Sequence, residues 1–366
     1  MNKTLANRKA AVRIPVSLRE AGMFLHRWLG LTAGLVFVIA GLTGSLLAYQ
    51  QELKTWMYPE IAGPPPEGWQ ERRAGVLSRI HAEGGSDVVL VRFPKSSQGV
   101  YETYLADDRL QYRDALDGDV VLERSPGNDW LEFSRELHVH LLAGETGELV
   151  MGWLGVIMLA LLLTGIWTWW PRRGLWRFAF RYPKTDRALP KVFWWHKTVG
   201  IALVPLLFFV TLTGVAMVFY FTAQGVLTSM LGGKPVDVPE KVERSGMSHD
   251  WKSIIASLDE TLEEGRTVFL YPSRAADEAL RFRKQMPGEL HPNGRSFIAM
   301  DRQGGVLHAN DATELEAGMR ATHAIYPLHS GQVGSETWRL VVALCGLLPL
   351  GFFITGFIIW RGKPKK

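Results

Sequence analysis

The chain has 366 residues, of which 47% are hydrophobic and 21% charged, with 41 Lys and Arg against 36 Asp and Glu. Its single cysteine, Cys345, excludes an intramolecular disulfide, an iron–sulfur cluster, a CxxC redox pair and the attachment motif of c-type haem. The surplus of positive charge is confined to three short segments, and this distribution excludes a nucleic-acid-binding surface as its explanation.

Residues 1–50 are predicted to form a basic arm and the first membrane span. The apolar segment Leu29–Tyr49 is long enough to cross a hydrocarbon layer of roughly 30 Å, which takes about 20 helical residues. It is also longer than the roughly 7–15 apolar residues of a cleavable signal peptide, so we expect a retained anchor. His26 stands just before this segment, and Thr43-Gly44 lies near its end.

Residues 51–148 form the first long polar loop, for which a helix and three strands are predicted. The helix is expected around Arg72–Ala82, and the strands at Val88–Phe93, Val100–Leu105 and Val120–Glu123. Leu137-His138 and His140 stand near the end of the loop, before the apolar segment Leu149–Trp170. The second span is therefore placed at residues 149–170.

Residues 171–198 are a basic loop with Trp195-His196 near its end, and the third span follows at residues 199–221. The second long polar loop, residues 222–337, repeats the order of elements of the first. A helix is predicted near Trp251–Leu262, followed by strands at Thr267–Tyr271, Leu280–Lys284, Phe297–Asp301 and Val306–Ala309. Residues 338–366 hold the fourth span, Trp338–Trp360, and a basic tail.

The charges are divided between the loops in a way that predicts the orientation. Of the 36 acidic residues, 34 lie in the two long loops, whereas the N-terminal arm, residues 171–198 and residues 361–366 hold 18 Lys and Arg. The positive-inside rule places the basic segments and both termini in the cytoplasm and the acidic loops outside. We therefore expect a multi-pass protein of the bacterial inner membrane with two periplasmic loops.

The spans are duplicated in sequence. An offset of 170 residues relates spans one and three, through His26 and His196, Gly30 and Gly200, and Thr43-Gly44 and Thr213-Gly214. An offset of 191 relates spans two and four, through His138 and His329, Gly155 and Gly346, and Thr164-Gly165 and Thr355-Gly356. The predicted fold is an integral membrane α-helical protein, a four-helix transmembrane bundle built from two tandem repeats, with two outer α+β modules.

Four duplicated histidines carry the functional prediction. An ionisable side chain is costly inside a membrane bundle, and neutral imidazoles on facing helices are the usual axial ligands of haem in a bundle core. We expect His26 and His196 to bind one haem at the cytoplasmic level, and His138 and His329 to bind a second at the outer level. Nearby alternatives for the outer level are His140 and His323, and the sequence leaves this choice open.

Cationic side chains near both levels are candidate partners of the haem propionates. Arg27, Lys197, Arg172 and Arg173 are candidates on the cytoplasmic side, and Arg135, Arg320 and Arg339 on the outer side. Each of them equally suits the role of a topology determinant or a lipid headgroup contact. The remaining histidines have no duplicated partner and are expected to be surface or turn residues: His81, His249, His291 and His308.

The chain resembles the PepSY-associated transmembrane family, and within it the FoxB-type ferric-siderophore reductases of bacterial inner membranes. The resemblance rests on His26-x-x-x-Gly30, Leu137-His138 followed by residues 141–147, Trp195-His196-x-x-x-Gly200 and Pro327-Leu328-His329-Ser330-Gly331. It implies PepSY-like outer modules, two bis-histidine b-type haems, and an oxidoreductase that passes electrons across the membrane to periplasmic ferric siderophores, releasing Fe(II). No nucleotide-binding motif is present, so a separate electron donor in the cytoplasm or membrane is expected.

Two other classes of function compete with this interpretation. A non-redox PepSY membrane module that binds or regulates a protease, or senses a ligand, gives no reason for paired histidines at both faces. A metal permease predicts polar residues in mid-span, and the four spans contain almost none. The identity of the siderophore, the donor and the oligomeric state are left open by the sequence.

Overall fold

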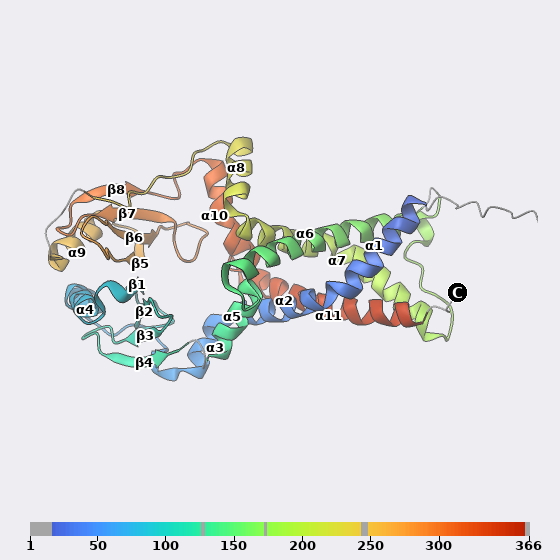
Figure 1. The fold of residues 1–366 in the computed structure, drawn as a ribbon, viewed down its shortest axis with the longest axis horizontal. Coiled ribbons are helices and arrows are strands. Elements are labelled where there is room, and N and C mark those ends of the chain that lie inside the picture. Colours follow the sequence, from blue (N-terminus) through green and yellow to red (C-terminus); the bar gives the residue numbers. More distant parts are fainter. Residues whose placement is uncertain (1–16, 126–128, 172–173, 243–247, 363–366) are drawn as a thin grey trace, which may run out of the picture.

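The computed structural model describes residues 17–125, 129–171, 174–242 and 248–362. A bundle of long helices lies at one end of the molecule and a β-sheet at the other (Figure 1). We call the end of the bundle that adjoins the sheet the sheet end. We call the opposite end of the bundle, where the C-terminal helix finishes, the far end. Arg172 and Arg173 lie outside the described residues.

The long helices agree with the predicted spans. Within the described residues, three are individually long and apolar enough to cross a membrane: α6 (Gly144–Trp169), α7 (Ala188–Val218) and α11 (Glu336–Arg361). A fourth candidate is the pair α1 (Leu18–Thr32) and α2 (Gly34–Leu47), which meet at a bend of 56°. The first span is therefore not the single straight helix that its apolar segment suggests.

Small residues allow the helices of the bundle to approach closely. Helix α2 packs against α11, and α6 packs against α7 and α1. Gly41 and Gly346 face each other so closely that a Cβ on either would collide with the carbonyl oxygen of the other. Ser45 Oγ donates across this contact to Ala343 O at 2.7 Å. Contacts of this kind are the usual basis of helix association in membranes, where apolar burial supplies no driving force between helices.

Four short helices at the sheet end were not predicted. They are α3 (Gln50–Met57), α5 (Trp130–His140), α8 (Tyr220–Leu231) and α10 (Ala317–Ser330). Helix α5 packs on α2 and α6, while α10 packs on α7 and α8. The described residues also include short 3₁₀ segments at Pro59–Ile61, Gly85–Asp87 and Trp176–Phe178. Helices α5 and α10 are important here because they carry the duplicated histidines His138 and His329.

The strands of both polar loops join in one antiparallel sheet of eight strands, in the order β4-β3-β2-β1-β5-β6-β7-β8. Strand β1 pairs with β5 through Val91 opposite Leu270 and Arg92 opposite Phe269. Seven of the strands were predicted, and β3 was missed. The bounds are β1 (Val88–Arg92), β2 (Tyr101–Leu105), β3 (Leu110–Arg113), β4 (Val120–Arg124), β5 (Arg266–Tyr271), β6 (Leu280–Gln285), β7 (Ser296–Met300) and β8 (Val306–Asn310).

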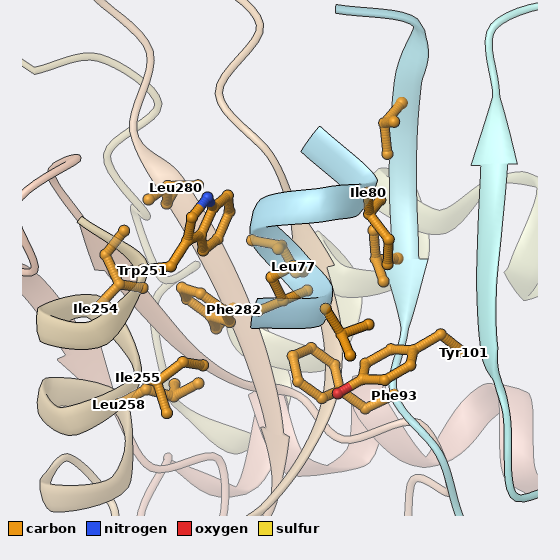
Figure 2. Packing of buried hydrophobic residues seen from close by; sticks show 14 of the residues in the cluster. Leu77, Ile80, Phe93, Tyr101, Trp251, Ile254, Ile255, Leu258, Leu280 and Phe282 are labelled. Carbon is orange, nitrogen blue, oxygen red and sulfur yellow. The ribbon is translucent and has the colours of Figure 1, made fainter. Parts of the chain in front are cut away.

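One apolar core spans both halves of the sheet. Helices α4 (Trp69–Gly84) and α9 (Trp251–Glu260) lie side by side on the face away from the bundle (Figure 1). Leu77 of α4 and Ile254 of α9 pack with Phe282 of β6 in a single cluster (Figure 2). Burial of each such side chain contributes roughly 1.5–3 kcal/mol. The two polar loops therefore share a core.

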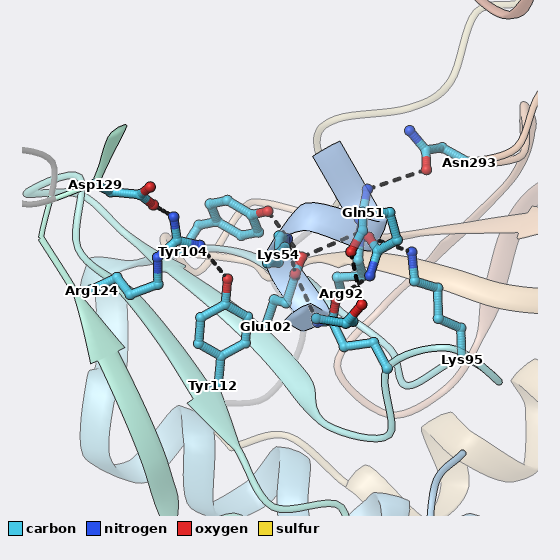
Figure 3. A network of polar contacts seen from close by, with 12 residues as sticks. Gln51, Lys54, Arg92, Lys95, Glu102, Tyr104, Tyr112, Arg124, Asp129 and Asn293 are labelled. Carbon is cyan, nitrogen blue, oxygen red and sulfur yellow. Dashed lines mark hydrogen bonds and ion pairs between the residues drawn. The ribbon is translucent and has the colours of Figure 1, made fainter. Parts of the chain in front are cut away.

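The face of the sheet toward the bundle carries a buried ionic network (Figure 3). Glu102 is 0% exposed and accepts from Lys54 Nζ of α3 at 2.7 Å, from Gln98 Nε2 at 2.8 Å and from Tyr104 Oη at 3.0 Å. Although burial raises the pKa of Glu102, the adjacent Lys54 and Arg92 cations hold that pKa well below its ordinary value. The network fixes α3 to the sheet.

Candidate functional site

The four duplicated histidines lie in two pairs, one at each end of the bundle. His26 of α1 and His196 of α7 form the far-end pair, with ring centroids 6.3 Å apart and ring planes at 83°. His138 of α5 and His329 of α10 form the sheet-end pair, with centroids 6.3 Å apart and planes at 40°. The two levels are well separated, because Thr213, which contacts His329, lies seventeen positions after His196 on α7, or about 25 Å along the helix.

Each histidine lies against a Thr-Gly dipeptide of a neighbouring helix. The side chains meet through histidine Nδ1 and threonine Oγ1 in all four places. These distances are 3.4 Å for His26 and Thr164, 2.7 Å for His196 and Thr355, 3.2 Å for His138 and Thr43, and 3.3 Å for His329 and Thr213. The sequence identified these dipeptides only as landmarks of the duplication, so their contact with the histidines is a finding of the structure.

The glycine of each dipeptide makes room for the imidazole. A Cβ on Gly44 would lie 2.8 Å from His138 Cε1, and one on Gly214 would lie 2.9 Å from His329 Cε1. At Gly165 the corresponding distance to His26 is 3.1 Å, whereas at Gly356 it is 3.6 Å, an ordinary van der Waals contact to His196. A side chain at the first three positions would therefore push the ring away.

The hydrogen bonds determine which ring nitrogen carries the proton. His26 Nδ1 lies 3.1 Å from Leu161 O, and His138 Nδ1 lies 2.8 Å from Ala40 O. His329 Nδ1 lies 2.9 Å from a backbone carbonyl of α7, that of Val210. Because a carbonyl only accepts, Nδ1 is the protonated nitrogen in these three neutral rings and Nε2 keeps its lone pair.

His196 is also protonated at Nδ1, but its hydrogen-bond partner is a hydroxyl group and not a carbonyl. Its Nδ1 lies 2.7 Å from Thr355 Oγ1, and that hydroxyl donates its own proton to Gly351 O at 2.8 Å. The threonine therefore accepts from His196 Nδ1. Within the described chain, no hydrogen bond reaches Nε2 of any of the four histidines. A neutral imidazole with Nδ1 donating and Nε2 free is the usual state of a metal-ligating histidine.

The spacing of the pairs fits an imidazole–metal–imidazole arrangement. A metal ion bound by imidazole lies about 2.0–2.1 Å from the nitrogen, so two rings sharing one ion have centres about 6 Å apart. Both observed spacings, 6.3 Å, agree with this value. Among the described residues no group of three or more His, Cys, Asp and Glu side chains forms a metal site. Two histidines suffice for haem, whose macrocycle supplies the other ligands of the iron.

Buried polar atoms beside the pairs also fit a cofactor. Arg27 Nε and Thr198 Oγ1 near the far-end pair, and Ser330 Oγ near the sheet-end pair, are buried without a hydrogen-bond partner. Buried polar groups in folded proteins are normally satisfied, so an unsatisfied group indicates a missing partner. The donors are of the kind that haem propionates accept from.

The alternative histidines for the sheet-end pair lie elsewhere. His140 Nδ1 contacts Glu136 Oε2 at 2.7 Å, and its Nε2 lies 3.8 Å from Glu148 Oε2. His323 lines a separate cavity of about 400 Å³ together with His291. The structure thus brings His138 and His329 together and holds His140 and His323 apart from them.

Most of the predicted propionate partners are engaged with other groups. Lys197 Nζ donates to Ala179 O at 2.7 Å, and the Arg27 guanidinium lies 5.8 Å from the centre of the Trp28 ring. Arg135 pairs with Glu132 and Glu136, Arg339 pairs with Glu52 and Glu336, and Arg320 lines the cavity of His323. Of these cations, only Arg27 has an unsatisfied buried nitrogen within the part of the chain that the structure describes.

Of the unduplicated histidines, which were predicted to be surface or turn residues, His291 begins a turn, since Gly294 N donates to its carbonyl oxygen at 2.9 Å, and His81 and His249 are half-buried. His291 is 3% exposed and stacks on Tyr326 at 5.1 Å between ring centroids. The rings of His81 and His249 lie 4.3 Å apart, and His249 Nε2 contacts Ser273 Oγ at 2.9 Å. The reason is that the shared sheet brings α4 and the start of α9 together, which no spacing in the sequence reveals. The fourth, His308, lies on the edge strand β8.

The family described as PepSY-associated TM region matches the chain over residues 23–363. This match includes the four paired histidines and their Thr-Gly dipeptides. No curated protein matches the chain.

Proposed function

This protein belongs to the PepSY-associated TM region family of membrane proteins, and from that premise we propose that it is a redox protein holding two b-type haems. The observation that carries the proposal is the geometry of the two histidine pairs. Each has a centroid spacing of 6.3 Å, and each imidazole is held through Nδ1, while none of the described residues forms a hydrogen bond with Nε2. His26 and His196 would bind one haem, and His138 and His329 the other.

The chain's own residues would prepare both sites for electron transfer. Haem bound by two histidines supplies reversible one-electron exchange between Fe(III) and Fe(II). Three backbone carbonyls and the Thr355 hydroxyl accept from Nδ1 of the four rings, and the Thr-Gly dipeptides pack against the rings and orient them. Between the two levels the bundle is filled with apolar side chains, among them Leu162, Leu207 and Cys345. This packing excludes water and strengthens the electrostatic influence of nearby groups.

We propose that each histidine pair combines one histidine from each of the two tandem repeats. The contacts between histidine and Thr-Gly lie within a half, as His138 with Thr43 and His329 with Thr213 illustrate. Each histidine pair, in contrast, joins one half to the other. The outer PepSY-like modules are residues 51–148 and 222–337. The distribution of charge supports an orientation with these modules in the periplasm and both termini in the cytoplasm.

The proposed reaction is reduction of a ferric siderophore at the periplasmic face, as in FoxB-type reductases. One electron converts Fe(III) to Fe(II) and no bond of the chelator is broken. Siderophore oxygen donors are hard ligands that favour the ferric ion, so the reduced metal is held more weakly. The motif resemblance of the four histidine segments supports this substrate class. An unidentified one-electron donor in the cytoplasm or membrane would supply each electron to the far-end site.

An optical spectrum of the purified protein tests this function. We expect a Soret band, bis-histidine α and β bands after reduction with dithionite, and reoxidation of the reduced protein by a ferric siderophore. A protein reconstituted with haem that shows no Soret band would refute the redox function. It would favour instead a non-redox module that binds or regulates a protease or senses a ligand.

A further inference from the structure

A cavity of about 640 Å³ lies between the sheet and the bundle. Residues of both polar loops line it, including Arg92 of β1 and Arg266 of β5, the two strands that join the halves of the sheet. Its volume lies within the roughly 300–1,000 Å³ that is typical of small-molecule sites. The position on the midline of the sheet makes it a site that neither half forms alone.

The cavity adjoins the sheet-end histidine pair. Tyr326 lines it and lies three residues before His329 on α10. Ala48 also lines it and lies four residues after Gly44, which packs against His138. Both separations correspond to about one helical turn, or roughly 5 Å. A molecule in the cavity would therefore lie next to the site from which we propose that electrons leave the protein.

Cationic side chains outnumber the carboxylates in the lining. Arg92, Lys95, Arg266 and Arg339 contribute to it, against the carboxylates of Glu52 and Glu336. Arg339 forms ion pairs with both of those carboxylates, at 2.6 and 2.7 Å. Both carboxylates that line the cavity are therefore paired with Arg339.

Lys95 and Arg266 form hydrogen bonds to neutral side chains. Lys95 Nζ donates to Gln51 Oε1 at 2.9 Å, and Arg266 Nη2 donates to Gln285 Oε1 at 2.8 Å. In the described chain no carboxylate forms an ion pair with either of them. Arg92 lies 3.6 Å from buried Glu102, which it shares with Lys54, and also donates to Asn293 Oδ1 at 3.2 Å (Figure 3).

The cations also repel one another. Burial and the nearby Arg92 guanidinium lower the pKa of Lys95 to about 8. The same two causes, in the same order, lower the pKa of Arg266. An anion between these groups would relieve their repulsion and supply the charged partners that they lack.

We propose that this cavity is the substrate site of the reductase and that it selects ferric chelates of net negative charge. The inference rests on the proposed function and adds the substrate class to it. Carboxylate-type chelates, in which hydroxycarboxylate oxygens hold the iron, have the required charge. Lys95 and Arg266 bind peripheral oxygens of the chelate, while one electron converts its Fe(III) to Fe(II) without cleavage of the ligand. Cationic hydroxamate chelates are disfavoured by the same charges.

The test separates binding from reduction by using gallium(III) citrate, a redox-inert stand-in for the ferric chelate. Calorimetry on the full-length protein in detergent compares the wild type with Arg266→Gln and with Lys95→Gln/Arg266→Gln. The matched control is Arg72→Gln/Lys252→Gln, which removes the same charge from exposed positions of α4 and α9 on the other face of the sheet. We expect Kd to rise about 10-fold or more in the double variant, less in the single variant, and not at all in the control.

A second measurement compares chelates of opposite charge. Dithionite-reduced protein should be reoxidised faster by ferric citrate than by a cationic ferric hydroxamate, and the double variant should lose that preference. Equal gallium citrate affinity in the wild type and both cavity variants would overturn the proposal, as would a wild-type preference for the cationic chelate. Charge-dependent gallium binding by a protein without a Soret band would support the anion site and refute the reductase.

Discussion

Thr43 Oγ1 lies 3.2 Å from His138 Nδ1, although 95 residues separate them in the chain. The threonine lies on the first span and the histidine on the short helix that precedes the second. Ala40 O of the same span also lies 2.8 Å from Nδ1. The two contacts together hold the histidine against the bundle rather than against the sheet. The equivalent contact between Thr213 and His329 in the second half gives the sheet-end pair two similarly held rings.

The glycines beside the histidines should be intolerant of alanine. In Gly44→Ala the new methyl group would lie 2.8 Å from His138 Cε1 and displace the ring. We expect loss of about half of the bound haem, measured by the pyridine haemochrome assay. The control is Gly225→Ala, at an exposed position of α8 where nothing outside the local helix lies within 4 Å of the added methyl group. Full haem content in Gly44→Ala would contradict the arrangement of the sheet-end pair.

The four threonines should differ in importance. Thr355 is the one hydrogen-bond partner of His196 Nδ1 that the described residues provide, whereas His138 keeps Ala40 O when Thr43 is lost. Removal of the partner of a ligating histidine typically weakens metal binding about 10–100-fold. Thr355→Val should therefore reduce haem affinity within that range, and Thr43→Val should have a smaller effect. Titration of apoprotein with haemin measures both, and a larger loss in Thr43→Val would argue against this ranking.

Alanine at the paired histidines should separate the two levels. His26→Ala or His196→Ala should lose about half of the haem and stop electron uptake from the cytoplasmic side. His138→Ala or His329→Ala should leave the far-end haem reducible and abolish ferric reduction. The matched control is His140→Ala, because His140 contacts Glu136 at 2.7 Å rather than a second histidine. If that control loses haem while His138→Ala retains it, the assignment of the sheet-end ligands is wrong by two residues.

Glu102 should be essential for the stability of the sheet domain. Glu102→Gln leaves Lys54 and Arg92 without their shared buried carboxylate, and breaking a buried ion pair in this way typically costs about 3–5 kcal/mol. Because the pKa of Glu102 is held below its ordinary 4.5, its contribution is complete above that pH and is lost as the pH falls. Thermal unfolding followed by tryptophan fluorescence measures the change. Glu60→Gln, at an exposed position, is the control, and equal midpoints would contradict the role of the network.

The contact between His81 and His249 should make the sheet domain sensitive to acid. Burial, then the His81 ring and Arg302, lower the pKa of His249 to about 4, and burial followed by Arg302 lowers that of His81. Both rings are neutral in the folded state when an unfolded histidine, with its pKa of 6.5, already binds a proton. Stability should therefore be complete above pH 6.5 and decline as the pH falls toward 4. His249→Gln should flatten the dependence of Tm on pH in this range, and an unchanged slope would contradict the interpretation.

The sequence by itself determined the local elements and the family. Four apolar segments of membrane-spanning length, seven of the eight strands and helices α4 and α9 were all predicted, because each depends on a pattern of hydrophobicity within about 5 to 20 neighbouring residues. The PepSY-associated assignment was confirmed by the match over residues 23–363. Helices α3, α5, α8 and α10 were missed, although α3, α5 and α10 are amphipathic; they lie between membrane spans and polar loops.

Only the tertiary structure decided how these elements meet. The offsets of the sequence matched His138 with His329 but did not show that each would lie against a Thr-Gly dipeptide of another span. The choice of His138 over His140 follows from the packing of α5 on α2, because side chains two residues apart on a helix point in nearly opposite directions. The pairing of β1 with β5, which creates the cationic cavity, depends on contacts between residues almost 180 positions apart. Contacts of that range are set by the packing of whole elements, and no local pattern of residues encodes them.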